Sequence, residues 1–154
     1  MEKTNVMRLL DVTSIEYFAF EYSSDITDGK LVAKALNEDE NCVFKTLVTV
    51  APTKNYYVFV IPVNCTLNLK KAAKVVNEKS IEMLKQKDLL PLTGYIHGGC
   101  SPIGMKKPFK TVINDTAELF DYIYVSAGKV GKQIKINAND LANYIGASFF
   151  DITD

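Results

Sequence analysis

The chain has 154 residues, 47% of them hydrophobic and 23% charged, and its 18 basic and 18 acidic side chains give a formal net charge of zero. This is the composition of a globular domain; it excludes a mainly disordered chain, and no apolar run reaches the roughly 18 residues of a membrane helix. The N-terminus lacks a signal-peptide core and the three cysteines are widely spaced, so we expect a cytoplasmic protein without disulfides.

The first half of the chain is predicted to mix helices and strands. Helix caps, helical hydrophobic spacing and β-branched or aromatic runs indicate the elements. In chain order they are a helix over 4–12 capped by Thr4, a strand over 17–22, a helix over 27–36, strands over 43–50 and 56–63, and a helix over 69–76 capped by Asn68. The short link between the strands over 43–50 and 56–63 indicates a hairpin. The helix over 69–76 is expected to turn Leu69, Ala72, Ala73 and Val76 inward.

The second half continues this mixture. It is predicted to hold a short strand over 80–84, a helix over 85–92 that Gly94 ends, a strand over 111–113, strands over 122–126 and 133–136, a helix that begins at Asn137 or Asn139 and ends near Gly146, and a strand over 148–152. The strict alternation of a doubly wound parallel sheet is absent. We therefore expect an α/β fold, a single domain over residues 1–154 with helices packed on a mixed β-sheet.

The net charge of zero hides an uneven distribution. Residues 1–45 carry a net −4, residues 46–135 a net +7 and residues 136–154 a net −3. A basic middle segment between acidic ends suits a polyanion bound on one side of the protein. The alternative, which charge alone favours, is that these are solvated faces whose signs happen to cluster.

The residues present exclude several catalytic chemistries. His97 is the only histidine, so a metal site of several histidines is impossible, and a catalytic Ser-His or Cys-His pair would need His97 itself. The run 126–133 superficially resembles a phosphate-binding loop, but Ser126 replaces its first glycine and Gln133 replaces the serine or threonine that binds magnesium. Nucleotide hydrolysis is therefore not expected, and we predict neither a metal nor a cofactor.

Lys45 is the first candidate functional residue. Side chains alternate along a strand, so Lys45 shares a face with Val43 and Leu47, where its ammonium group loses hydration unless a partner is present. The alternative is an edge-strand lysine that extends its ammonium group to solvent, and the residue considered alone favours that alternative.

The second candidate is the glycine-rich segment 94–107. Four glycines and one proline within eleven residues leave a backbone that can approach a ligand closely and present its N–H groups. Ser101 adds a hydroxyl group, and Lys106 and Lys107 add positive charge. The alternative is a tight loop that only joins two elements.

Six segments, in their order and spacing, carry a resemblance to a known family. They are Phe-Lys-Thr-Leu-Val at 44–48, Ile-Pro-Val at 61–63, Leu-Lys-Lys-Ala-Ala-Lys at 69–74, Ile-Glu-Met at 81–83, Thr-Gly-Tyr and Gly-Gly-Cys-Ser-Pro-Ile-Gly within 93–104, and Val-Ser-Ala-Gly-Lys at 125–129. Together they resemble the YbaK/EbsC family of aminoacyl-tRNA deacylases, relatives of the editing domain inserted in bacterial prolyl-tRNA synthetases. The resemblance covers nearly the whole chain and implies a compact α/β domain with a twisted mixed sheet.

The resemblance also implies a function. The protein would cleave mischarged aminoacyl-tRNA in trans, with Cys-tRNA(Pro) as substrate, tRNA and prolyl-tRNA synthetase as partners, and no cofactor or membrane. Because the sequence offers no obvious general base, the family mechanism fits, in which the substrate's own cysteine thiol attacks its ester carbonyl. The alternatives are an Ala-tRNA(Pro) deacylase that uses water and a non-catalytic module that binds a CCA end or a nucleotide.

By resemblance, Lys45 is the essential catalytic lysine, expected to anchor the ester end of the substrate. The other expected substrate contacts are Tyr22, Thr46, Gly98, Gly99, Ser101, Pro102 and Ser126. The candidates for tRNA phosphate contacts are Lys106, Lys107, Lys110, Lys129 and Lys132. Two positions depart from the family pattern: Asp28 stands where relatives often carry an aromatic residue, and Gln133 where some carry an acid. Cys100 is a variable position.

Overall fold

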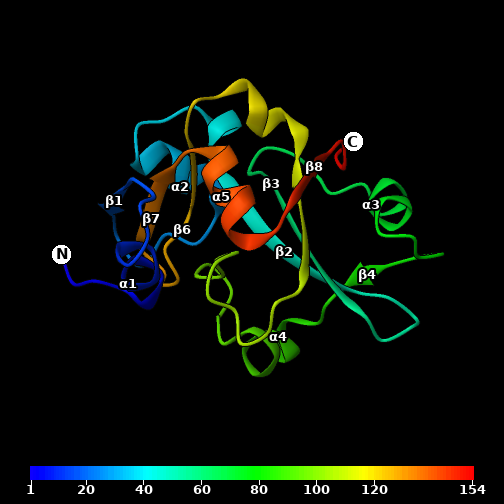
Figure 1. Cartoon of the computed structure of the whole chain (residues 1–154). Coiled ribbons are helices and arrows are strands. Elements are labelled where there is room, and N and C mark those ends of the chain that lie inside the picture. The colour runs from blue at the N-terminus through cyan, green and yellow to red at the C-terminus, as the bar shows by residue number, and fades with distance from the viewer.

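Eight strands form two hydrogen-bonded sheets in the computed structural model, which describes all residues 1–154 (Figure 1). The smaller sheet is antiparallel in the order β1-β7-β6, with β1 (Tyr17–Glu21), β6 (Ile123–Ser126) and β7 (Lys132–Ile136). The larger has the order β4-β2-β3-β5-β8, with β2 (Phe44–Val50), β3 (Tyr56–Pro62), β4 (Glu82–Met83), β5 (Lys110–Asn114) and β8 (Ser148–Phe150). β3, β5 and β8 run parallel while β2 is antiparallel to both its neighbours, so the predicted mixed α/β fold is confirmed.

The two sheets meet at a single parallel bridge between Val43, just before β2, and Tyr124 of β6. Beyond this bridge β2 and β6 diverge without further pairing. On the same side of β2, β4 pairs only with Thr49 and Val50. One edge of β2 is therefore unpaired over residues 45–47. In Figure 1 the small sheet lies on one side of the molecule and the β2–β3 hairpin runs to the other.

Five α-helices and two short 3₁₀ helices cover the sheets. They are α1 (Asn5–Asp11), α2 (Gly29–Ala35), η1 (Glu40–Cys42), α3 (Leu69–Val75), α4 (Gln86–Thr93), η2 (Asp115–Leu119) and α5 (Ala138–Ile145). The side chains of Thr4 and Asn68 accept backbone hydrogen bonds from the first turns of α1 and α3, which confirms both predicted caps. Asn137, not Asn139, caps α5, and Gly94 ends α4 as predicted. None of these helices is both long and apolar enough to cross a membrane.

Two predictions about local structure differ from the observed fold. The strand predicted over 80–84 is confined to Glu82–Met83, which pair with Val50 and Thr49 of β2, and Leu84 adds only a single backbone hydrogen bond to Val48 (3.0 Å). Leu69 is 39% exposed, so the prediction that it faces inward is wrong. It is the first residue of α3 and lies at the helix end, whereas Ala72 and Ala73 lie over the sheet and are buried.

Three apolar clusters hold the layers together. In the largest, Val6 and Leu10 of α1 and Leu141 of α5 are fully buried with residues of both sheets. The second packs α3 on β3, and the third packs α2 against Tyr124 of β6 and the end of β3. A Cβ added at Gly29 would lie 2.6 Å from the Val63 side chain, so glycine lets α2 begin this close to β3.

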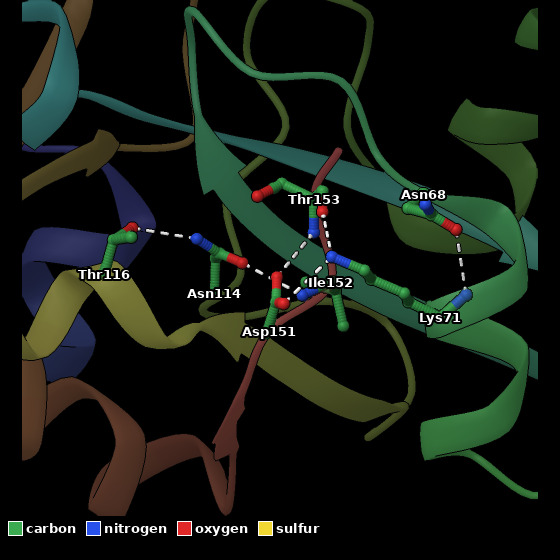
Figure 2. Close-up of polar contacts among 7 residues, drawn as sticks. All are labelled: Asn68, Lys71, Asn114, Thr116, Asp151, Ile152 and Thr153. Carbon is green, nitrogen blue, oxygen red and sulfur yellow. Dashed lines mark hydrogen bonds and ion pairs between the residues drawn. The ribbon is translucent and has the colours of Figure 1, made fainter.

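The last residues of the chain are tied back to the larger sheet. Asn114, buried at the end of β5, accepts a hydrogen bond from the Ile152 N–H (3.0 Å). Figure 2 shows the Lys71 ammonium group of α3 reaching Asp151 (2.9 Å) and the carbonyl oxygen of Thr153 (2.8 Å). Residues 151–154 thus connect α3 to β5, away from the unpaired edge of β2.

Candidate active site

A cavity of about 460 Å³ opens where β2 and β6 diverge. Its wall is built from the start of α2, the first half of β2, the glycine-rich loop after α4, and the facing ends of β6 and β7. Residues 43–47 all line it. Because successive strand side chains point to opposite faces, five consecutive residues share one cavity only when it lies along the strand edge. The cavity therefore occupies the unpaired edge of β2.

The backbone of β2 presents polar groups to the same edge. The carbonyl of Val43 accepts the N–H of Val63 on the β3 side (2.8 Å), and the carbonyl of Val48 accepts the N–H of Leu84 on the opposite side (3.0 Å). Backbone groups alternate along an antiparallel strand, so those of Thr46 point to the same side as those of Val48. No strand pairs with β2 on that side at Thr46, which leaves this peptide facing the cavity.

Lys45 and Thr46 add side chains that have no partner within the protein. Lys45 is half-buried and takes part in none of the chain's three ion pairs. The Thr46 hydroxyl oxygen is buried and has no hydrogen-bond partner. Leaving a buried polar group unpaired costs about 1–3 kcal/mol, so both groups are suited to contact a ligand in the cavity.

The glycine-rich loop closes one side of the cavity by approaching two other segments closely. Gly98 lines the cavity with a φ of +85°, and a Cβ added there would lie 3.0 Å from a Thr27 side-chain carbon. A Cβ added at Gly99 would lie 3.0 Å from the backbone nitrogen of Val130, in the β6–β7 turn. The absence of a side chain lets the loop approach Thr27 at Gly98 and the β6–β7 turn at Gly99.

Three of the expected substrate contacts in this loop lie behind the cavity wall. Gly99, Ser101 and Pro102 are buried and do not line the cavity. The Ser101 hydroxyl accepts a hydrogen bond from the Ile103 N–H (3.2 Å), a contact that shapes the loop. In this structure these residues support Gly98 rather than touching the cavity themselves.

Ser126 and Gln133 form the opposite wall, paired across the ends of β6 and β7. The buried Ser126 hydroxyl accepts a hydrogen bond from the Gly128 N–H (3.1 Å). Gln133 Nε2 donates to the Tyr22 hydroxyl (3.4 Å), whereas Gln133 Oε1 is buried without a partner. Tyr22 lies behind Gln133, outside the cavity wall, and burial raises the pKa of its phenol, which stays neutral.

The cavity also contains polar residues that the sequence does not single out as contacts: Asp28, His97 and Cys100. Asp28 caps α2 by accepting the Lys30 N–H (3.0 Å), and His97 is exposed at the rim. Burial raises the pKa of the Cys100 thiol to about 12, so it stays protonated and is a poor nucleophile. The only sequence signal for His97 and Cys100 is their place in the glycine-rich loop.

No three or more histidine, cysteine, aspartate or glutamate side chains gather where they could hold a metal ion. The wall offers instead one ammonium group, one imidazole, one carboxylate, one thiol, hydroxyl and amide groups and the free strand edge. The donors among these groups can orient an ester and stabilise negative charge on its oxygen atoms.

The five candidate phosphate-binding lysines fall into two groups. Four are exposed: Lys106, Lys107, Lys110 and Lys129. Lys132 differs, because its side chain is only 13% exposed and its ammonium group donates to the Glu2 carbonyl (2.9 Å) and lies 3.8 Å from Glu21. Lys132 is therefore engaged within the protein.

Sequence comparison identifies relatives of the chain. The family model described as the aminoacyl-tRNA editing domain matches residues 24–144, a span that contains the whole cavity wall. EbsC of Enterococcus faecalis, a proposed Cys-tRNA(Pro)/Cys-tRNA(Cys) deacylase, is 43% identical over 154 residues, which cover 99% of this chain and 94% of EbsC.

Solved structures share the fold at low sequence identity. A proposed trans-editing enzyme for prolyl-tRNA synthetase superposes with a TM-score of 0.85 at 18% identity, over 100% of this chain and 99% of that one. The hypothetical protein APE2540 superposes with a TM-score of 0.89 at 18% identity, over 97% and 99% of the two chains. With a matching family model and a relative of this identity over its full length, the chain belongs to the aminoacyl-tRNA editing domain family.

Proposed function

We propose that this protein is a trans-editing deacylase that cleaves mischarged Cys-tRNA(Pro). The observation that supports this best is the convergence of Lys45, Thr46, Gly98 and Ser126 on one cavity in a chain of the editing family. The name of EbsC, as a proposed Cys-tRNA(Pro)/Cys-tRNA(Cys) deacylase, supports the same substrate.

In the proposed reaction the cavity orients the substrate and the substrate supplies the nucleophile. The cysteine sulfur forms a bond to the ester carbonyl carbon, the bond from that carbon to the ribose oxygen breaks, and the thiol proton ends on the ribose oxygen. The products are free tRNA and a cyclic thioester of cysteine. Lys45 donates to the carbonyl or terminal ribose oxygens, where negative charge develops. The Cys100 thiol, held protonated, does not compete as a nucleophile.

His97 supports a second candidate, an Ala-tRNA(Pro) deacylase that uses water. It lines the cavity, and histidine is the side chain that most often serves as a general base. An alanyl ester has no thiol, so this reaction needs such a base.

We further propose that the acceptor end of the tRNA is held by the exposed lysines beside the cavity. Lys106 and Lys107 end the glycine-rich segment, and Lys129 belongs to the turn that Gly99 contacts. Prolyl-tRNA synthetase is the proposed partner, because it produces the mischarged tRNA. A reaction of this kind takes place in the cytoplasm, where tRNA is charged.

The test is the requirement for the substrate thiol. Cys-tRNA(Pro) and tRNA(Pro) charged with 2-aminobutyrate, which keeps the size of cysteine and lacks sulfur, are incubated with the free enzyme, with and without the synthetase. We expect deacylation of the cysteinyl substrate only. Equal rates for both would contradict the thiol mechanism and favour water and His97, and binding without turnover would favour a module that only binds the CCA end.

A further inference from the structure

Only two buried side-chain polar atoms of the chain lack a hydrogen-bond partner, and both belong to residues that line the cavity. They are Thr46 Oγ1 on β2 and Gln133 Oε1 on β7. Thr46 belongs to the edge that carries Lys45, whereas Gln133 lies on the opposite wall and is 6% exposed. Because folded proteins pair nearly all buried polar atoms, an unpaired atom in a cavity wall indicates a group that a ligand completes.

The orientation of the Gln133 amide follows from its neighbour. Its Nε2 donates to the Tyr22 hydroxyl at 3.4 Å, which leaves Oε1 as the amide atom without a partner in a residue of the cavity wall. The backbone of Tyr22 is held by a hydrogen bond from its N–H to the Gly131 carbonyl (2.9 Å), so the hydroxyl is presented from a fixed position. An amide oxygen only accepts hydrogen bonds, so the ligand must bring a donor to this wall.

An aminoacyl ester carries one strong donor close to its carbonyl, the α-ammonium group on the adjacent carbon. With the carbonyl or ribose oxygens at Lys45, like-charge repulsion turns the α-ammonium group away from the lysine. The wall opposite β2 offers the unpaired oxygen of Gln133, and a hydrogen bond from a charged donor is among the stronger ones.

We propose that Gln133 Oε1 accepts a hydrogen bond from the free α-amino group of the substrate, with Tyr22 as the positioning residue that orients the amide. This inference rests on the proposed function and names a substrate class. The enzyme acts on aminoacyl-tRNA with a free α-amine and spares N-acylated forms such as peptidyl-tRNA. Acylation removes the positive charge and two of the three N–H donors and adds bulk at the same place.

The experiment compares Cys-tRNA(Pro) with N-acetyl-Cys-tRNA(Pro) in single-turnover cleavage, corrected for spontaneous hydrolysis. Gln133→Met keeps the length of the side chain and removes its polar atoms, Gln133→Glu keeps an acceptor, and Tyr22→Phe removes the hydroxyl that orients the amide. The matched control is Gln86→Met, the same change at the chain's other glutamine, which is exposed at the start of α4.

We expect the wild type and Gln86→Met to cleave the free-amine substrate at least about ten-fold faster than the acetylated one. In Gln133→Met this ratio falls toward one, because only cleavage of the free-amine substrate slows. Tyr22→Phe lowers the ratio less, and Gln133→Glu preserves it. A ratio that Gln133→Met leaves unchanged overturns the proposal, since the preference is then steric. A loss in Gln133→Glu as large as in Gln133→Met also overturns it, because the amide then acts as a donor. Asp28 is the carboxylate of the cavity wall, so Asp28→Asn is measured as well. If the ratio collapses in Asp28→Asn and not in Gln133→Met, the amine binds Asp28 and the proposal is overturned.

Binding separates this inference from the proposed function. A non-hydrolysable analogue, adenosine with a cysteinyl amide at its 3′ position, and its N-acetyl form are titrated calorimetrically against the same proteins. Preference for the free amine that disappears in Gln133→Met supports the inference even if the wild type cleaves no tRNA. Equal binding of the two analogues by the wild type overturns it, whatever the deacylation assay shows.

Discussion

Lys45 occupies a position that strands rarely give to lysine, half-buried on the face shared by Val43 and Leu47. An edge lysine that extends to solvent would also lack an ion pair. That alternative does not account for the position of Lys45 in a cavity wall. The neighbouring Thr46 hydroxyl is unpaired as well. Two adjacent polar side chains without partners at one unpaired strand edge are best explained by a ligand that supplies the partners.

The first prediction concerns Lys45 itself. We expect Lys45→Ala to stay folded, with its free energy of unfolding within about 1 kcal/mol of the wild type. Its single-turnover deacylation is expected to fall roughly 100-fold or more, because the developing charge on the ester loses a positioned donor. A thermal melt beside the deacylation assay separates the two effects.

Lys45→Arg serves as the control for charge. Arginine keeps the positive charge but spreads it over a planar group with a different hydrogen-bonding geometry, so we expect little rescue. Full activity of a folded Lys45→Ala protein would remove the residue from the mechanism. Near-complete rescue by arginine would indicate long-range attraction to phosphate instead of a contact with the ester.

At the scale of elements, the cavity lies at one end of the β2–β3 hairpin, where residues 43–47 and Val63 line it. The C-terminal residues add a separate anchor, in which Asn114 is the buried member and the pair Lys71–Asp151 lies at the surface (Figure 2). Asn114 uses both ends of its amide, accepting from the Ile152 N–H and donating to the Thr116 hydroxyl (2.8 Å). The buried amide should therefore dominate the stability of this anchor.

The second prediction follows from this difference in burial. Asn114→Ala is expected to lower the free energy of unfolding by about 1–3 kcal/mol, because it leaves the Ile152 N–H without an acceptor. Lys71→Met should change it much less, since the side chains of Lys71 and Asp151 are 42% and 57% exposed and water screens the pair. Urea unfolding measures both variants.

Deacylation by these two variants is the companion measurement, and we expect it to match the wild type at temperatures where both are folded. Equal destabilisation by Lys71→Met and Asn114→Ala would contradict this prediction, because the surface contacts of Lys71 would then stabilise the C-terminal residues as much as the buried amide does.

At the scale of the whole molecule, only some of the lysines in the basic segment 46–135 are free to contact a polyanion. Lys132 is engaged by Glu2 and Glu21, so the acidic N-terminal part neutralises one lysine of the basic segment. Lys106, Lys107 and Lys129 stay exposed close to the loop and the turn that close the cavity. The tRNA is therefore expected to meet the protein on the side of this loop.

The third prediction tests that side. Replacing Lys106 and Lys107 together by methionine should weaken tRNA binding and flatten the slope of log affinity against log salt by about one to two contacts. The matched control is Lys70→Met with Lys74→Met, two exposed lysines of α3, which should leave the slope unchanged. An unchanged slope in the first pair would mean that these lysines only solvate a loop.

The sequence by itself determined the elements and the family. Thr4, Asn68 and Gly94 act at the helix ends where local capping rules predict them, and the β-rich runs around residues 51–55 form the expected hairpin. These signals are local, because a cap or a strand pattern depends on neighbours within a few residues. The ordered motifs likewise identified the editing family, which the comparisons confirm.

Only the tertiary structure decided which of these residues share the cavity. The cavity exists because β2 and β6 separate after the single bridge between Val43 and Tyr124, a pairing of residues far apart in the chain. That divergence brings Gln133 into the same cavity wall as Lys45. Ser101 lies behind the wall, although the sequence places it in a motif just as it does Gln133. Motifs of one chain cannot specify this selection, because it depends on long-range strand pairing, whose register and end points are set by the packing of the whole domain.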